Sequence, residues 1–416
     1  MFVLILVFLA TSCSDTSQTS STTEQTVGKP TSHTNTADRD AGDDADDTAG
    51  SSTAWTRDPA RTSMASSMTP DTATVYGYTH GQASGNRVVE GEGRLPEAEP
   101  VDVSLSGTPV WVVGVPLEND TAWVVAYGDG RVDAFRLDGE RGEVEPWLTA
   151  PDRLPPGAPP AVAVEGDRLE LITAPGGRGS RPTHPVRGEA GLIGVTSDGV
   201  LFTEPGEVPS LSVLPDARIV QSSDGSVAVL SSPTDRYVHG VLGDGLEAGG
   251  IGVLGPGGGG YELDVEIQPE SGGVFEALAP LWFRPGEDGA GEELLTVTES
   301  AEGVGSRISV YSPDGALVAA GPFVGEAQKW RHLIAAGPFG PNGEIELAAT
   351  RTPHVGGTTE FYRLNRESGV LELAATGPGY PSHTIYSRNL DAAIAGDLDG
   401  DGAWELLVPN ASYNGL

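Results

Sequence analysis

Short runs of apolar and β-branched residues recur along most of this chain, from about Val101 onward, and turns rich in Gly, Pro and Asp separate them. Runs of about four to eight such residues, bounded by turn-forming residues, predict β-strands. No convincing long stretch has the period of an amphipathic helix. The strongest predicted strands are residues 110–115, 122–127, 168–173, 226–231, 293–298, 344–350 and 404–409. We therefore expect an all-β fold.

Several Asp-Gly pairs lie between or beside these runs. Glycine adopts at little cost the left-handed backbone conformation that two-residue hairpin turns require. The pairs begin at Asp129, Asp138, Asp198, Asp224 and Asp314. They predict that one hairpin follows another along the chain.

An internal repeat organises the C-terminal half. Segments 337–350 and 396–409 share an alanine-rich lead, a loop and an E-L/I-x-L strand, and their starts lie 59 residues apart. A degenerate earlier copy occupies 280–297. Each copy spans about four strands, too few to close a core alone, and radial stacking of such units gives a β-propeller. We expect six or seven four-stranded blades, and the alternative is unrelated hairpins packed as a sandwich.

The loop of the last repeat carries the strongest chemical signal. Carboxylates stand at alternate positions 1, 3 and 5, a glycine follows, and another carboxylate stands at position 9. Calcium prefers about six to eight oxygen ligands, which a tight turn of alternating side chains supplies. The expected ligands are the side chains of Asp397, Asp399, Asp401 and Glu405 and the carbonyl of Ala403. An EF-hand would need glutamate at position 12, where this chain has Val408, and the remaining alternative is an acidic, solvated turn.

The stretch AGDLDGDGAWELLV (395–408) resembles the FG-GAP or VCBS repeat of integrin-like β-propellers and bacterial surface proteins. The resemblance covers about residues 275–416, and the pattern of short apolar runs separated by turns extends it to about residue 100. It implies a β-propeller whose strand-loop-strand sites bind Ca²⁺. The other copies depart from the pattern: Pro338 and Gly340 replace two aspartates, and Arg284-Pro285 occupy the loop of the 280 copy, which keeps Asp288 and Glu293. One full-strength site suggests a structural brace.

A second group of polar residues lies at Asp235, Arg236, Tyr237 and His239. Alternation along a strand would place Asp235, Tyr237 and His239 on one face, where they form either a polar pocket on the propeller axis or an Asp-His brace within a blade. The remaining histidines look scattered along the sequence. Trp282 and Trp330 are candidate sugar-stacking residues if they are exposed.

The first residues indicate export. Phe2–Ala10 is an apolar run too short to span a bilayer, and small residues lead from it to Cys13, the single cysteine. Residues 1–13 therefore resemble a signal peptide with a lipobox-like end, and Cys13 would carry the lipid. Simple secretion and a buried apolar strand are the alternatives. Residues 14–95 are rich in Ser, Thr and Asp and predict a disordered linker, which leaves 96–416 for the propeller.

Charge excludes several classes of partner. Acidic residues number 59 and basic residues 24, giving a formal net charge of −35. No basic surface is available for nucleic acid, and an anionic membrane would repel the chain, so membrane attachment is expected only through the lipid anchor.

No common catalytic motif is present either. We expect a non-catalytic module for protein interaction or adhesion at the bacterial envelope or surface, rather than an enzyme. The alternatives are a carbohydrate-binding propeller and a hydrolase or lyase on the propeller axis. The last repeat ends early, so we expect either that residues 101–107 complete the last blade or that the chain is a fragment.

Overall fold

The computed structural model describes residues 53–55, 74–76, 102–117, 120–138, 144–149, 153–165, 168–173, 182–203, 206–286, 290–388, 390 and 393–415. Within these ranges the secondary structure consists of 27 β-strands, with no α-helix. The prediction of an all-β fold is confirmed. In the same ranges, nothing helical has the length and apolar character needed to cross a bilayer.

Three antiparallel sheets of four strands come from the N-terminal half of the described chain. The first follows chain order: β3 (Pro109–Pro116), β4 (Asp120–Tyr127), β5 (Val132–Asp138) and β6 (Val144–Thr149). The second has the order β1 (Thr53–Trp55), β8 (Arg168–Ile172), β7 (Ala161–Glu165) and β2 (Thr74–Tyr76). The third contains β9 (Val186–Gly188), β10 (Gly191–Val195), β11 (Val200–Thr203) and β12 (Glu207–Ser212).

A sheet of 13 strands follows, and it consists of three antiparallel meanders joined at their margins. The first meander is β13 (Val220–Gln221), β14 (Val227–Thr234), β15 (Glu247–Gly257) and β16 (Gly260–Ile267). The second is β18 (Leu281–Phe283), β19 (Leu294–Ala301), β20 (Gly305–Tyr311) and β21 (Leu317–Ala320). The third is β22 (Arg331–Gly337), β23 (Glu346–Arg351), β24 (Thr358–Asn365) and β25 (Val370–Pro378). Strand β17 (Val274–Phe275) joins the first two, and one parallel pair between β21 and β25 joins the last two.

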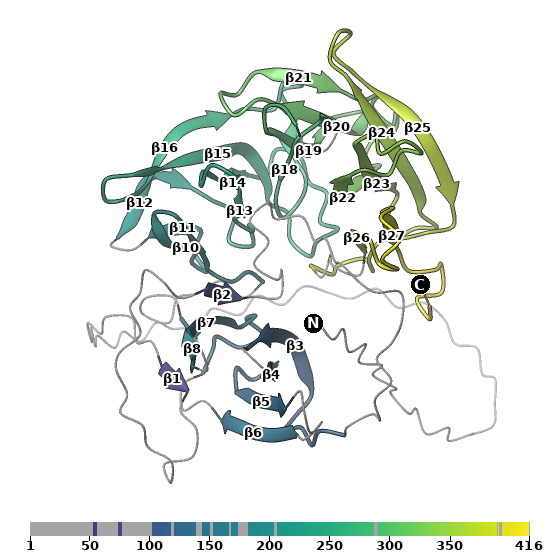
Figure 1. Ribbon diagram of the computed structural model, residues 1–416. Coiled ribbons are helices and arrows are strands. Elements are labelled where there is room, and N and C mark those ends of the chain that lie inside the picture. The colour runs from purple at the N-terminus through teal and green to yellow at the C-terminus, as the bar shows by residue number, and fades with distance from the viewer. Residues whose placement is uncertain are drawn as a thin grey trace, which may run out of the picture.

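The final sheet has two strands, β26 (Ile394–Gly396) and β27 (Glu405–Leu407). Figure 1 shows the sheets in chain order along a curved path, from β3–β6 through β13–β16 to β22–β25, with β26 and β27 beside β22. This arrangement is propeller-like. Strands β1 and β2 fall inside the predicted linker, whose other residues lie outside the described ranges, so the boundaries at 13 and 95 stay predictions.

The local predictions agree with the observed pairing. Each of the seven predicted runs overlaps a strand, although β27 covers only half of 404–409. Gly337 pairs with Glu346 as Gly396 pairs with Glu405, which confirms the 59-residue repeat. Hairpin turns carry glycines of positive φ at Gly130, Gly199, Gly225 and Gly315.

The expectation that residues 101–107 complete the last sheet is wrong for the described residues 102–107. They form no strand, and Val103 and Leu105 are exposed. Residue 101 itself lies outside the described ranges.

Aliphatic and aromatic side chains from neighbouring sheets fill the core. The largest cluster joins the β10–β12 strands to β14, β15 and β19. Trp282 and Trp330 are 1% and 2% exposed. Their proposed role as exposed sugar-stacking residues is therefore wrong, because both rings pack inside the protein.

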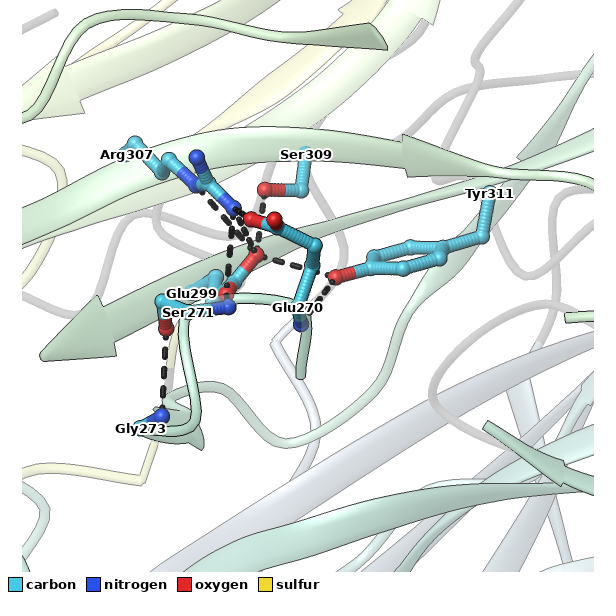
Figure 2. A network of polar contacts seen from close by, with 7 residues as sticks. All are labelled: Glu270, Ser271, Gly273, Glu299, Arg307, Ser309 and Tyr311. Carbon is cyan, nitrogen blue, oxygen red and sulfur yellow. Dashed lines mark hydrogen bonds and ion pairs between the residues drawn. The ribbon is translucent and has the colours of Figure 1, made fainter. Parts of the chain in front are cut away.

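The buried carboxylate of Glu299 in β19 links this strand to its neighbour β20 and to the loop at Ser271. Figure 2 shows Glu299, which is fully buried and accepts hydrogen bonds from the Ser271 amide (2.6 Å), the Ser309 hydroxyl (2.6 Å) and the Tyr311 hydroxyl (2.9 Å). Arg307 adds an ion pair at 3.1 Å. Burial alone would raise the pKa of Glu299, but these donors and the guanidinium hold it below its ordinary value. The Glu299 carboxylate is therefore paired with several donors, and we interpret this network as structural.

Candidate functional site

The acidic loop between β26 and β27 brings three of the predicted ligands together. One carboxylate oxygen from each of Asp397, Asp399 and Glu405 lies within 4.8 Å of the others. Asp399 is exposed, and the other two side chains are half-buried. Pairing of β26 with β27 holds Glu405 against the start of the loop, because Gly396 and Glu405 are opposite each other in the register.

Backbone amides point into this loop and fix its carboxylates. Asp397 accepts hydrogen bonds from Gly400 (2.7 Å) and Gly402 (2.9 Å), and Glu405 accepts one from Leu398 (2.8 Å). Gly400 and Gly402 have φ of 76° and 88°, a region that residues with a side chain rarely adopt. The chain can therefore wrap around its own carboxylates.

Asp401 lies in the same turn but outside the group of three. Its carboxylate accepts a hydrogen bond from the Ala403 amide at 2.8 Å. The roles predicted for Asp401 and for the Ala403 carbonyl stay predictions. The fit of the loop to a hard cation rests on Asp397, Asp399 and Glu405.

The two degenerate copies use their equivalent carboxylates in ion pairs. Glu346 receives the guanidinium of Arg363 at 2.5 Å, and Glu293 lies 3.5 Å from Arg284. Asp288 lies outside the described residues. Glu405 instead belongs to an all-carboxylate group.

A pocket opens beside the acidic loop, with a volume of about 350 Å³. Phe339 stacks edge-on against both Phe361 and Trp404 at ring-centroid distances of 5.3 and 6.0 Å. The Arg363–Glu346 pair supplies polar atoms at its wall. Trp404, directly before β27, lines this pocket together with Phe339 and Phe361.

The predicted group at 235–239 has a different geometry from the one expected. These residues follow the end of β14 and form a loop, so the alternation of a strand does not apply. Asp235 and Arg236 are exposed, and Tyr237 is buried. His239 contacts Glu276, not Asp235, with Nδ1 and Oε1 2.5 Å apart. The expected Asp-His brace is thus a Glu-His pair between two loops.

A histidine cluster that the sequence did not predict lies next to this pair. Trp330, which precedes β22, contacts the rings of His239, His332 and His383 at 6.5, 6.0 and 5.3 Å. His354 lies 5.7 Å from His383. The Ser382 hydroxyl lies 2.7 Å from Nδ1 of His332 and 3.1 Å from Nδ1 of His383. No local spacing signals this cluster, because its members come from loops and strands far apart in sequence.

Burial lowers the pKa of three of these imidazoles. It lowers the pKa of His332 to about 3, with a further contribution from the charge of Arg218. It lowers the pKa of His383 to about 2, and that of His354 falls as well. All three rings are neutral near pH 7. The predicted lipidation site Cys13 lies outside the described residues.

Comparison with known proteins gives a fold-level likeness without a family. No protein-family model matches the chain, and no curated protein matches it. The FG-GAP/VCBS resemblance therefore stays a prediction.

Solved structures similar to the chain include a putative 6-phosphogluconolactonase from Bacteroides uniformis (14% identity, TM-score 0.34, covering 74% of this chain and 91% of that one). Another is BBS1N in complex with ARL6DN (14%, 0.32, 74% and 90%). A third is the rhamnogalacturonan lyase PL11 of Bacillus licheniformis (13%, 0.33, 79% and 61%). At such TM-scores these likenesses carry no conclusion about activity or ligands.

Proposed function

We propose that this chain is an exported, non-catalytic β-propeller that displays a binding surface for a protein or glycan partner and is braced by Ca²⁺. Cys13 anchors it by a lipid to the bacterial envelope. In this proposal the sheets form seven blades, and the last blade has two strands, β26 and β27. The convergence of Asp397, Asp399 and Glu405 is the observation that carries the calcium assignment.

The donor set fits a hard cation. Three carboxylates within 4.8 Å repel one another unless a cation or hydrogen-bond donors compensate their charge. The amides of Leu398, Gly400 and Gly402 supply part of that compensation. Each carboxylate oxygen that accepts an amide keeps a second lone pair for a metal, so the amide contacts and calcium ligation are compatible.

Thermal unfolding of the full chain in calcium and in chelator tests this assignment. Binding to the native state alone raises stability by about 2.7 kcal/mol at a hundredfold excess over Kd. We expect a calcium-dependent rise in Tm that Asp399→Asn abolishes. Asp264→Asn, which neutralises an exposed aspartate on β16, is the matched control and should keep the rise. Equal melting of the native chain in calcium and chelator would refute the calcium brace.

The pocket beside the loop favours glycan as a second candidate class of ligand. Phe339, Phe361 and Trp404 provide aromatic surface, and the Arg363–Glu346 pair provides hydrogen-bonding atoms, the combination that sugar rings require. The net charge of −35 favours neutral over anionic glycans.

A glycan array separates the two ligand classes. Signal from neutral glycans that Trp404→Ala abolishes and Tyr386→Ala retains would support the pocket, since Tyr386 is an exposed aromatic outside it. Absence of signal from the native chain would leave protein partners as the ligand class. The array result is independent of the calcium experiment.

A further inference from the structure

Four of the chain's seven histidines belong to one network. His239 lies in the loop after β14, His332 in β22, His354 between β23 and β24, and His383 between β25 and β26. Contacts through Trp330 and directly between rings connect them. Folding therefore gathers imidazoles from several loops, and the proposed function uses none of them.

Three of these imidazoles have one ring nitrogen in contact with a polar partner. His239 Nδ1 contacts the carboxylate of Glu276, which is 2% exposed. His383 Nδ1 contacts Ser382 Oγ, which in turn contacts His332 Nδ1. A histidine that binds a metal through one nitrogen usually donates the other N–H to a carboxylate or another acceptor in this way, which fixes the tautomer and ring orientation.

Two other ring nitrogens in the cluster are buried without a hydrogen-bond partner. They are Nε2 of His383, whose residue is 1% exposed, and Nδ1 of His354. Leaving such a group unpaired is unfavourable, because the nitrogen loses its hydrogen bonds to water on burial and gains none in return. The rings that carry these two atoms are in edge-on contact, with centroids 5.7 Å apart and planes at 62° to each other.

We propose that His354 Nδ1 and His383 Nε2 bind a divalent transition-metal ion of the zinc class, with Glu276-supported His239 and water completing the coordination. Neutral imidazole is a preferred ligand for Zn²⁺ and its neighbours in the first transition series. Two imidazoles on one tetrahedral zinc have ring centroids about 5 Å apart, given a Zn–N distance of about 2.0–2.1 Å. The observed separation of 5.7 Å is close to that value.

Metal binding requires a local side-chain rearrangement. In the described residues only the acidic loop holds three donor atoms within 4.8 Å of one another, so the imidazoles close around the ion by rotation. His239 and His354 are the half-buried members and can move, while Ser382 and His383 are fully enclosed and form the fixed side.

Isothermal titration of the full chain with Zn²⁺, at saturating calcium, tests the proposal. We expect one ion per chain, and d–d absorption in the visible range when Co²⁺ replaces Zn²⁺. His354→Gln and His383→Gln should each weaken binding at least tenfold, and His239→Gln should weaken it less. Asp399→Asn should leave zinc binding unchanged, which separates this site from the calcium loop.

His184, a buried histidine that contacts Pro185, provides the control His184→Gln, which should bind Zn²⁺ like the native chain. His383 is enclosed, so loss of binding in His383→Gln counts only if its Tm without zinc matches that of the native chain. If the Tm of His383→Gln differs from that of the native chain, zinc binding by His354→Gln, at the half-buried position, tests the proposal instead. No zinc binding by the native chain, or equal binding in His354→Gln, would overturn the proposal.

Discussion

Two buried glutamates show how surroundings set the chemistry of a single residue. Glu299 is surrounded by amide, hydroxyl and guanidinium donors, and these hold its pKa below the ordinary value despite burial. Glu247, at the start of β15, is 7% exposed and lies near Glu276, Asp244 and Asp216. Burial and these negative charges raise the pKa of Glu247 to about 10. The first group is therefore ionised and the second protonated near pH 7.

Replacing Glu247 should change how stability depends on pH. A carboxyl group with a raised folded-state pKa stabilises fully below its unfolded value of about 4.5, and this stability is lost as pH rises toward 10. The loss is at most about 1.4 kcal/mol per pH unit. Glu247→Gln keeps the shape without the titration, so it should match the native chain near pH 4.5 and be more stable at pH 7 to 8.

Urea unfolding at several pH values measures this effect. Glu262→Gln, on the exposed face of β16, is the control and should follow the native pH dependence. If Glu247→Gln loses stability with pH as steeply as the native chain, the folded protein does not hold a proton at Glu247.

At the scale of elements, hairpin turns of one type recur. In three of them a Ser or Thr hydroxyl donates a hydrogen bond to the Asp carboxylate of the Asp-Gly pair that follows. This bond fixes the first part of the turn, and the glycine of the pair completes it with a positive φ. The pairs are Thr196 and Asp198, Ser222 and Asp224, and Ser312 and Asp314. Local hydrogen bonding thus explains why these three Asp-Gly pairs predicted hairpins correctly, whereas Gly139 of the Asp138 pair lies outside the described residues.

Gly337 in β22 contacts the ring of Trp404, which precedes β27, and this contact requires a residue without a side chain at position 337. A Cβ placed on Gly337 would lie 2.3 Å from the ring of Trp404. Gly337→Ala should therefore displace Trp404 and cost about 1–3 kcal/mol, the usual effect of overpacking. Because Trp404 directly precedes Glu405, calcium affinity should fall as well.

Thermal unfolding and calcium titration check both effects. Gly258→Ala, where an added Cβ has no neighbour within 4 Å, should behave like the native chain. A fully native Tm and calcium affinity in Gly337→Ala would show that β22 and Trp404 do not pack as described.

At the scale of the molecule, two sites of different character lie in separate places. The acidic loop is exposed and built from nine consecutive residues, so it can take a cation from solvent without rearranging the core. The histidine cluster is mostly enclosed and joins residues of the first and third meanders and of the β25–β26 connection. A chain with net charge −35 attracts cations to both sites.

The amino-acid sequence by itself determined the strands, the Asp-Gly turns, the 59-residue repeat and the acidic loop. Each depends on residues that are neighbours in the chain, so pattern and spacing contain the information. Only the tertiary structure decided the partner of His239, the burial of Trp282 and Trp330, and the gathering of His332, His354 and His383. These depend on packing between segments tens of residues apart, and no local pattern specifies which side chains meet there.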